Sequence, residues 1–146
     1  MDLTADVVAP CRPDELFVWV ADLRMYPRWL GLVERVESED SDLDAWIVDI
    51  GARIGPFARS KRLRMVEAER VASTRVVFER RELDGRDHGE WRMSADLEPD
   101  GESTRLTMRL HYGGRLWGPV LEPVLADEVE RSRQRLVDLV EGSTAP

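Results

Sequence analysis

The apolar positions near the C-terminus recur at helical spacing, from Gly118 to Glu141, with charged residues opposite them. The members of this stripe are Leu121, Leu125, Val129, Leu136, Leu139 and Val140. Pro119 near the start and Gly142 after the end are typical of a helix start and stop, so we predict one long helix from about Pro119 to Glu141. Ser132 occupies the centre of the stripe, where a dense core would place a larger apolar residue. This gap predicts a cavity beside the helix.

The N-terminal residues alternate between apolar and polar from position 2 to 9, which predicts a half-buried strand. Pro13, followed by two acidic residues, predicts the start of a helix. The inner stripe of this helix is formed by Leu16, Phe17, Val20 and Leu23. Pro27 disfavours helical geometry at the residue before it, so the segment Met25 to Gly31 should interrupt this helix and form a second short one closing at Gly31.

After this segment the apolar residues change from helical spacing to alternation with polar residues, and this alternation continues for about eighty residues. Strands are predicted at 33–37, 45–53, 57–67, 75–82 and 90–97, followed by a last strand with inward-facing Leu106, Met108, Leu110 and Tyr112. The turns between them are predicted at Asp40-Ser41-Asp42, Gly55-Pro56, Asp84-Gly85 and Pro99-Asp100-Gly101. Short turns between consecutive strands indicate an antiparallel meander. The predicted fold class is α+β: a helix-grip domain whose curved antiparallel sheet of about seven strands wraps around the C-terminal helix, with two short helices after strand one.

Length and composition fit one globular domain over residues 1–146, with 42% hydrophobic residues. The net charge of −8 argues against a nucleic-acid partner. No apolar run is long enough to span a bilayer, and Met1-Asp2 does not open a signal peptide, so integral membrane association is not expected. The single cysteine, Cys11, fits a reducing compartment, and we expect a cytoplasmic protein.

The standard signatures of catalytic and cofactor sites are missing from the chain. His88, His111 and Cys11 do not supply a metal site with ligand spacing, and there is no phosphate-binding, dinucleotide-binding or nucleophile-elbow motif. We therefore expect no metal and no cofactor, and the sequence assigns no catalytic residue. Both histidines are interpreted as solvated, and Cys11 as unreactive.

The predicted inner faces supply a candidate apolar pocket, the usual character of a site for a small organic ligand. The candidate ligand-binding residues are Tyr26, Trp29, Trp46, Ile50, Phe57, Met65, Phe78, Trp91, Met93, Met108, Tyr112, Leu125, Glu128 and Ser132. Tyr26 and Trp29 form either a lid over the cavity or an anchor that docks the short helices. The remaining aromatic residues and methionines line either a pocket or a filled core.

Two groups of charged residues are candidates for polar chemistry. Strand 57–65 is basic, and either parity of its alternation directs two basic side chains inward, toward a ligand carboxylate or enolate or toward solvent at the strand end. Glu128, on the flank of the helix, is the best acid/base candidate because partial burial raises a carboxyl pKa. A salt bridge to an arginine is the alternative role for Glu128.

The order of elements, together with three local motifs, resembles the START-like (SRPBCC) superfamily and, within it, the polyketide cyclase/dehydrase and lipid-transport family. The motifs are Ala9-Pro10…Pro13…Leu16-Phe17, Tyr26-Pro27-Arg28-Trp29-Leu30 and Ile54-Gly55-Pro56-Phe57. The third is similar to a turn in relatives of the carbon monoxide dehydrogenase accessory protein. The resemblance implies the helix-grip fold, but its members include both ligand binders and enzymes.

These observations favour a protein that holds a small hydrophobic ligand between its sheet and its C-terminal helix. The expected ligand class is a lipid, an isoprenoid quinone or a polyketide-like molecule. One alternative is an enzyme of the polyketide cyclase/aromatase kind, which needs convergent polar groups in the pocket. The other is a protein-binding adaptor with a filled core, which needs an exposed apolar patch. The protein is expected to be a monomer or a homodimer.

Overall fold

The computed structural model describes residues 2–39, 42–54, 57–113 and 121–144, without the side chains of 42–43, 52–54, 57–59, 121–126 and 143–144. Its elements follow in the order β1 (Asp2–Ala9), α1 (Pro13–Val20), the 3₁₀ helix η1 (Leu23–Arg28), β2 (Val33–Glu39), β3 (Asp42–Ile54), β4 (Phe57–Val71), β5 (Arg75–Arg80), β6 (Trp91–Asp100), β7 (Ser103–Tyr112) and α2 (Leu121–Thr144). This order confirms the predicted α+β arrangement of one strand, two short helices, six strands and a long helix.

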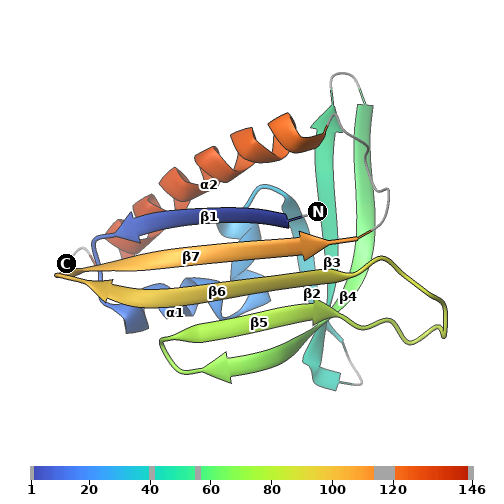
Figure 1. Cartoon of the computed structure of the whole chain (residues 1–146), viewed down its shortest axis with the longest axis horizontal. Helices are drawn as coiled ribbons and strands as arrows, with labels where there is room; N and C mark the ends of the chain where they lie inside the picture. The colour runs from blue at the N-terminus through green and yellow to red at the C-terminus, as the bar shows by residue number, and fades with distance from the viewer. Residues whose placement is uncertain (1, 40–41, 55–56, 114–120, 145–146) are drawn as a thin grey trace.

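All seven strands form one antiparallel sheet in the order β1-β7-β6-β5-β4-β3-β2. The first strand pairs with the last, with Ala5 opposite Met108. The remaining neighbours are consecutive in the chain, as expected for a meander joined by short turns. Figure 1 shows β1, β7, β6 and β5 running beside one another while β2, β3 and β4 stand at a steep angle to them, so the sheet is strongly curved. The helix α2 lies along the β1 side of this curve.

Hydrogen bonds to the carbonyl groups at the end of α1 hold the two short helices together and attach them to the sheet. The last carbonyl groups of a helix have no partner within the helix and must find one elsewhere. The Tyr26 hydroxyl donates to the Val20 carbonyl at 2.8 Å, and Trp29 Nε1 donates to the Trp19 carbonyl at 3.1 Å. Arg70 Nη2, from β4, donates to the Ala21 carbonyl at 2.9 Å. The C-terminal end of α1 is thereby attached to η1 and to the sheet.

The two faces of the sheet differ in chemistry. The inner face carries the apolar core, in which Val76, Phe78 and Leu106 are fully or almost fully buried. The outer face carries cross-strand ion pairs: Asp96 accepts from Arg75 at 2.6 Å and from Arg109 at 3.2 Å. Such partly exposed pairs contribute little to stability individually, but they keep the outer face polar and so determine which face packs against the helices.

Several boundaries differ from the sequence-based expectation. The helix α2 continues through Gly142 to Thr144, so the expected stop at Gly142 is wrong; an exposed glycine in a last turn weakens a helix by only about 1 kcal/mol relative to alanine. Strand β6 runs on to Asp100, and the turn reduces to Gly101 (φ +61°) and the following residue. Strand β5 ends at Arg80, earlier than expected, and η1 ends at Arg28. Pro119 and the turns at 40–41 and 55–56 lie outside the described residues.

Candidate functional site

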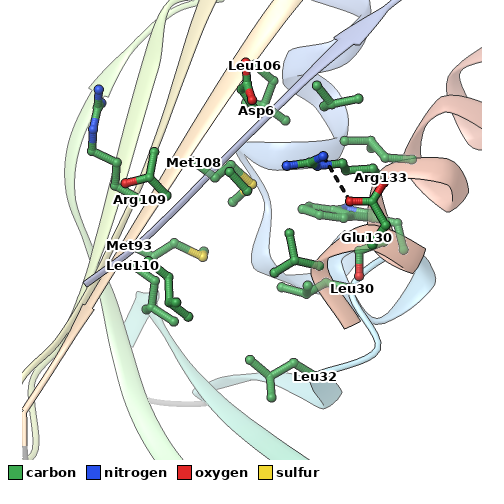
Figure 2. Close-up of a pocket in the computed structure, with 18 residues that line it drawn as sticks. Asp6, Leu30, Leu32, Met93, Leu106, Met108, Arg109, Leu110, Glu130 and Arg133 are labelled. Carbon is green, nitrogen blue, oxygen red and sulfur yellow. Dashed lines mark hydrogen bonds and ion pairs between the residues drawn. The ribbon is translucent and has the colours of Figure 1, made fainter. Parts of the chain in front are cut away.

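A cavity of about 330 Å³ lies between the β1–β7 side of the sheet and α2. Its walls come from three parts of the chain: the strands β1, β6 and β7, the segment that follows η1, and the helix α2. The lining residues are Leu3, Thr4, Ala5, Asp6, Val7, Trp29, Leu30, Leu32, Met93, Leu106, Met108, Arg109, Leu110, Val129, Glu130, Ser132, Arg133 and Leu136. Figure 2 shows Met93, Met108 and Leu110 on the strand side facing Leu30 and Leu32 across an open centre.

The cavity exists because the inward-facing side chains of the strands do not fill the space between the sheet and α2. Met93, Met108 and Leu110 face inward but remain only half-buried, whereas Phe78 on the neighbouring strand is fully buried. The facing residues Ala5 and Ser132 are small, so β1 and α2 leave space between them. The interior is therefore an apolar pocket with a few polar groups at its edge, which is the usual composition of a small-molecule site.

The charged residues of the rim are arranged in two groups. Asp6 and Arg109 belong to the outer face of the sheet and are paired there, with Arg105 at 2.8 Å and with Asp96 at 3.2 Å. Glu130 and Arg133 come from α2 and pair with each other at 3.0 Å, as the dashed line in Figure 2 shows. Only the second group comes from the helical wall of the cavity.

Tyr26 and Trp29 form an anchor of the short helices. Their rings are 4.8 Å apart between centroids, both are buried, and both donate hydrogen bonds to α1 carbonyls. Burial raises the pKa of the Tyr26 phenol well above its usual value, so this hydroxyl stays protonated as a donor. Trp29 also lines the cavity, whereas Tyr26 does not. The lid interpretation of Tyr26 finds no support in this geometry.

The other aromatic candidates pack into the core around the cavity. Phe78 meets the rings of Tyr26 and Trp46 edge to face, at 6.3 and 5.7 Å between centroids. Trp91 and Tyr112 are stacked at 5.4 Å between centroids, and the buried Trp91 Nε1 finds no hydrogen-bond partner in the part of the chain that the structure describes. None of these five residues lines the cavity.

The remaining candidates have different positions. Ile50 and Met65 are buried in the core and do not line the cavity, while Met93 and Met108 form its strand wall. The side chains of Phe57 and Leu125 lie outside the described residues.

Ser132 occupies the predicted gap in the apolar stripe and lines the cavity. Its hydroxyl donates to the backbone carbonyl of Glu128 at 2.7 Å, with the Glu128 carboxylate at 3.3 Å. The residue thus provides space, but its hydrogen-bonding capacity is used within the helix. Glu128 does not line the cavity: it accepts from Arg135 at 2.9 Å and packs against Gly31, where any side chain would collide with the carboxylate. This is the salt bridge of the alternative interpretation.

The parity of the basic strand is determined by its apolar members. Leu63 and Met65 are buried on the inner face, so Lys61 shares that face, while Arg62 and Arg64 point outward. Arg62 pairs with Asp49 at 2.8 Å and Arg64 with Glu39 at 2.6 Å. Burial, and then the nearby Arg80, lower the pKa of Lys61. Lys61 does not line the cavity, and the side chain of Arg59 lies outside the described residues.

A family model described as "Polyketide cyclase / dehydrase and lipid transport" matches residues 1–141. The chain belongs to this family. A comparison with curated proteins found no match.

The family member shares its fold with many solved structures at low sequence identity. A START superfamily protein from Mycobacterium smegmatis is 15% identical over 98% of this chain and 99% of its own, with a TM-score of 0.72. The Zhui aromatase/cyclase from Streptomyces sp. R1128 is 13% identical over 99% and 96%, with a TM-score of 0.71. A conserved protein from Geobacillus kaustophilus is 13% identical over 98% and 97%, with a TM-score of 0.75. At these identities the similarity establishes the helix-grip fold alone.

The two histidines and the cysteine of this family member do not line the cavity. His111 lies on the outer face, as predicted, and bridges Asp2 at 2.7 Å and Glu90 at 3.2 Å. His88 contacts Asp84 at 2.9 Å in the loop between β5 and β6. Burial raises the pKa of the Cys11 thiol to about 11, which keeps it a poor nucleophile.

Within the described part of the chain, no cluster of three or more histidine, cysteine or acidic residues is placed to hold a metal ion. No helix in the same part has the length and apolar character needed to cross a membrane.

Sequence reasoning missed Leu30 and Leu32 after η1, and it also missed two further parts of the cavity. The first is the β1 wall of Leu3, Ala5 and Val7, because alternation alone does not reveal that β1 pairs with β7. The second is Arg133, which lies on the stripe itself, four residues after Val129. The helical spacing of Arg133 indicated that it faces inward, but as a charged residue it was not counted with the apolar stripe.

Proposed function

We propose that the protein is a single-domain binder of a small hydrophobic ligand, which occupies the cavity between the sheet and α2. The observation that carries this proposal is the 330 Å³ space with apolar walls on both sides, Met93 and Met108 on the strands and Leu136 on the helix. Its size is at the lower end of ligand pockets. The family description, which includes lipid transport, supports the same conclusion. The ligand class is a lipid, quinone or polyketide-like molecule of modest size.

The open interior favours a binder over an adaptor with a filled core. An adaptor needs no space behind its surface, and inner-face residues such as Met93 and Leu110 would then pack against α2 instead of remaining half-buried. Unfilled apolar volume reduces stability, so a chain that retains it gains from having an occupant.

Decan-1-ol is a suitable neutral probe, and its binding can be measured by isothermal titration calorimetry. Met108→Trp places a larger side chain into the strand wall and should weaken binding at least about tenfold, with the urea midpoint little changed. Val71→Trp adds the same ring at an exposed position of β4 and serves as the control. Absence of binding to the unmodified protein, or equal binding by Met108→Trp, would reject the proposal.

An enzyme of the aromatase/cyclase kind is the second candidate, favoured by the similarity in fold to the Zhui aromatase/cyclase. The described cavity offers no pair of convergent acid and base groups, so such an enzyme would act by shaping a reactive chain. Turnover of a polyketide-like substrate should then fall more in Met108→Trp than in Glu128→Gln. The opposite ranking would identify Glu128 as an acid/base group.

A further inference from the structure

The α2 wall of the cavity contains one charged side chain at an apolar position of the helix. Arg133 follows Val129 by four residues and precedes Leu136 by three, so all three fall on one face. All three line the cavity. Figure 2 shows the Arg133 side chain extending from α2 toward Met108, which lies on β7.

The guanidinium of Arg133 is only partly satisfied. Nη1 donates to Glu130 Oε2 at 3.0 Å, whereas the buried Nε has no hydrogen-bond partner among the described residues. Nη2 donates no hydrogen bond to the described residues either. The side of the guanidinium formed by Nε and Nη2 is thus unpaired in the described part of the chain. The Arg133 side chain is 37% exposed and that of Glu130 is 71% exposed, so the existing pair is on the solvent side.

An open Nε/Nη2 side next to an apolar pocket fits a particular ligand chemistry. A buried N–H without a partner destabilises the protein, and a carboxylate relieves this by accepting two parallel hydrogen bonds from an arginine. The other cationic group of the described rim, Arg109, already pairs with Asp96 on the outer face. Arg133 is therefore the lining cation that is left available for a negatively charged group at the mouth of the cavity.

We propose that the ligand is an amphiphile with an apolar body and a terminal carboxylate, which is bound by the Nε/Nη2 side of Arg133. This inference rests on the proposed function and specifies its ligand class. Since a water molecule has a share of about 30 Å³ in the liquid, the cavity holds about ten groups of that size. A medium-length fatty acid such as decanoate matches this volume. The single open side of one guanidinium suits a planar monoanion.

Calorimetric titration with decanoate, and with decan-1-ol as the uncharged counterpart, tests the assignment. Arg133→Gln should weaken decanoate binding about 10- to 100-fold, because it removes charge-assisted hydrogen bonds, and change decan-1-ol binding less than about twofold. Arg131→Gln is the matched control, because Arg131 is exposed on the same helix and does not line the cavity. It should leave both affinities unchanged.

Two further variants strengthen the test. Glu130→Gln removes a neighbouring negative charge and should tighten decanoate binding about fivefold. Arg133→Lys keeps the charge but loses the paired donors, so decanoate should bind with intermediate affinity; it also serves if Arg133→Gln does not fold.

Equal loss of decanoate affinity in Arg131→Gln and Arg133→Gln would overturn the assignment. Binding of decan-1-ol without decanoate would overturn it while leaving the proposed function intact. If neither compound binds the unmodified protein, the proposed function fails as well.

Discussion

Replacing Ser132 with leucine tests whether the interior beside α2 is open. Ser132 is 3% exposed, lines the cavity and lies where the apolar stripe of the helix is interrupted. Among the described residues, its hydroxyl forms hydrogen bonds only with Glu128, within the helix. The carbonyl of Glu128 also receives the backbone N–H four residues later, so it keeps a partner when the hydroxyl is removed.

The size of the effect follows from burial. A fully buried leucine side chain contributes about 1.5–3 kcal/mol, and leucine exceeds serine in helix propensity by a few tenths. We expect Ser132→Leu to raise the free energy of unfolding by about 1–3 kcal/mol. The leucine also occupies the room of about two methylene groups, each worth about 0.8 kcal/mol to a ligand. The dissociation constant for decan-1-ol should therefore rise about 15-fold.

Urea denaturation followed by tryptophan fluorescence measures the first effect, and an unchanged m-value shows that the unfolding transition is the same. Calorimetry measures the second. The control is Arg131→Leu, which adds an apolar side chain to an exposed position of the same helix and should alter neither quantity by a comparable amount. A filled interior would instead be overpacked, with a loss of about 1–3 kcal/mol. Such a loss, with ligand binding unaffected, would refute the cavity.

Two further predictions concern hydrogen bonds outside the cavity. Tyr26→Phe removes the donor to the Val20 carbonyl, so the free energy of unfolding should fall by about 1–3 kcal/mol in urea denaturation; no change would show that this bond does not anchor η1. The bond to Asp2, and then Glu90, raise the pKa of His111 above its unfolded value of about 6.5. Its protonated ring therefore stabilises the fold fully below about pH 6.5, and this contribution disappears as pH rises through the folded pKa. The urea midpoint of the unmodified protein should decrease over that range relative to His111→Gln, and parallel pH profiles would contradict the assignment.

The fold was largely predictable because each element carries its own period. The alternation in 33–112 and the helical stripe in α2 depend on which side chains face the core, and this dependence is local. The ends of the strands were less predictable. Pro99 belongs to β6 and pairs with Thr104 of β7, although the residues Pro99-Asp100-Gly101 favour a turn. Cross-strand pairing prolongs a strand beyond the point where its local signal ends.

The site was less predictable because it depends on contacts between distant parts of the chain. Leu3, Ala5 and Val7 alternate like residues of any half-buried strand, and only the pairing of β1 with β7 brings them opposite α2. Phe78 and Met108 both face inward, yet one is fully buried and the other borders the cavity. Periodicity identifies the inner face, but it does not identify which part of that face lacks a neighbour.

The exposed rim of the cavity explains why the unfilled volume does not cost the protein most of its stability. A closed, dry void of 330 Å³ would cost about 8 kcal/mol at about 24 cal/mol per Å³, which is comparable to the whole stability of a small domain. Thr4, Asp6 and Glu130 on the rim are exposed, so the cavity communicates with solvent and the penalty is that of wetting apolar walls. An apolar ligand that replaces this solvent removes part of the penalty and stabilises the folded state by mass action, about 2.7 kcal/mol at one hundred times its dissociation constant. The same unfilled volume that weakens the free protein would thus supply the affinity of the proposed binder.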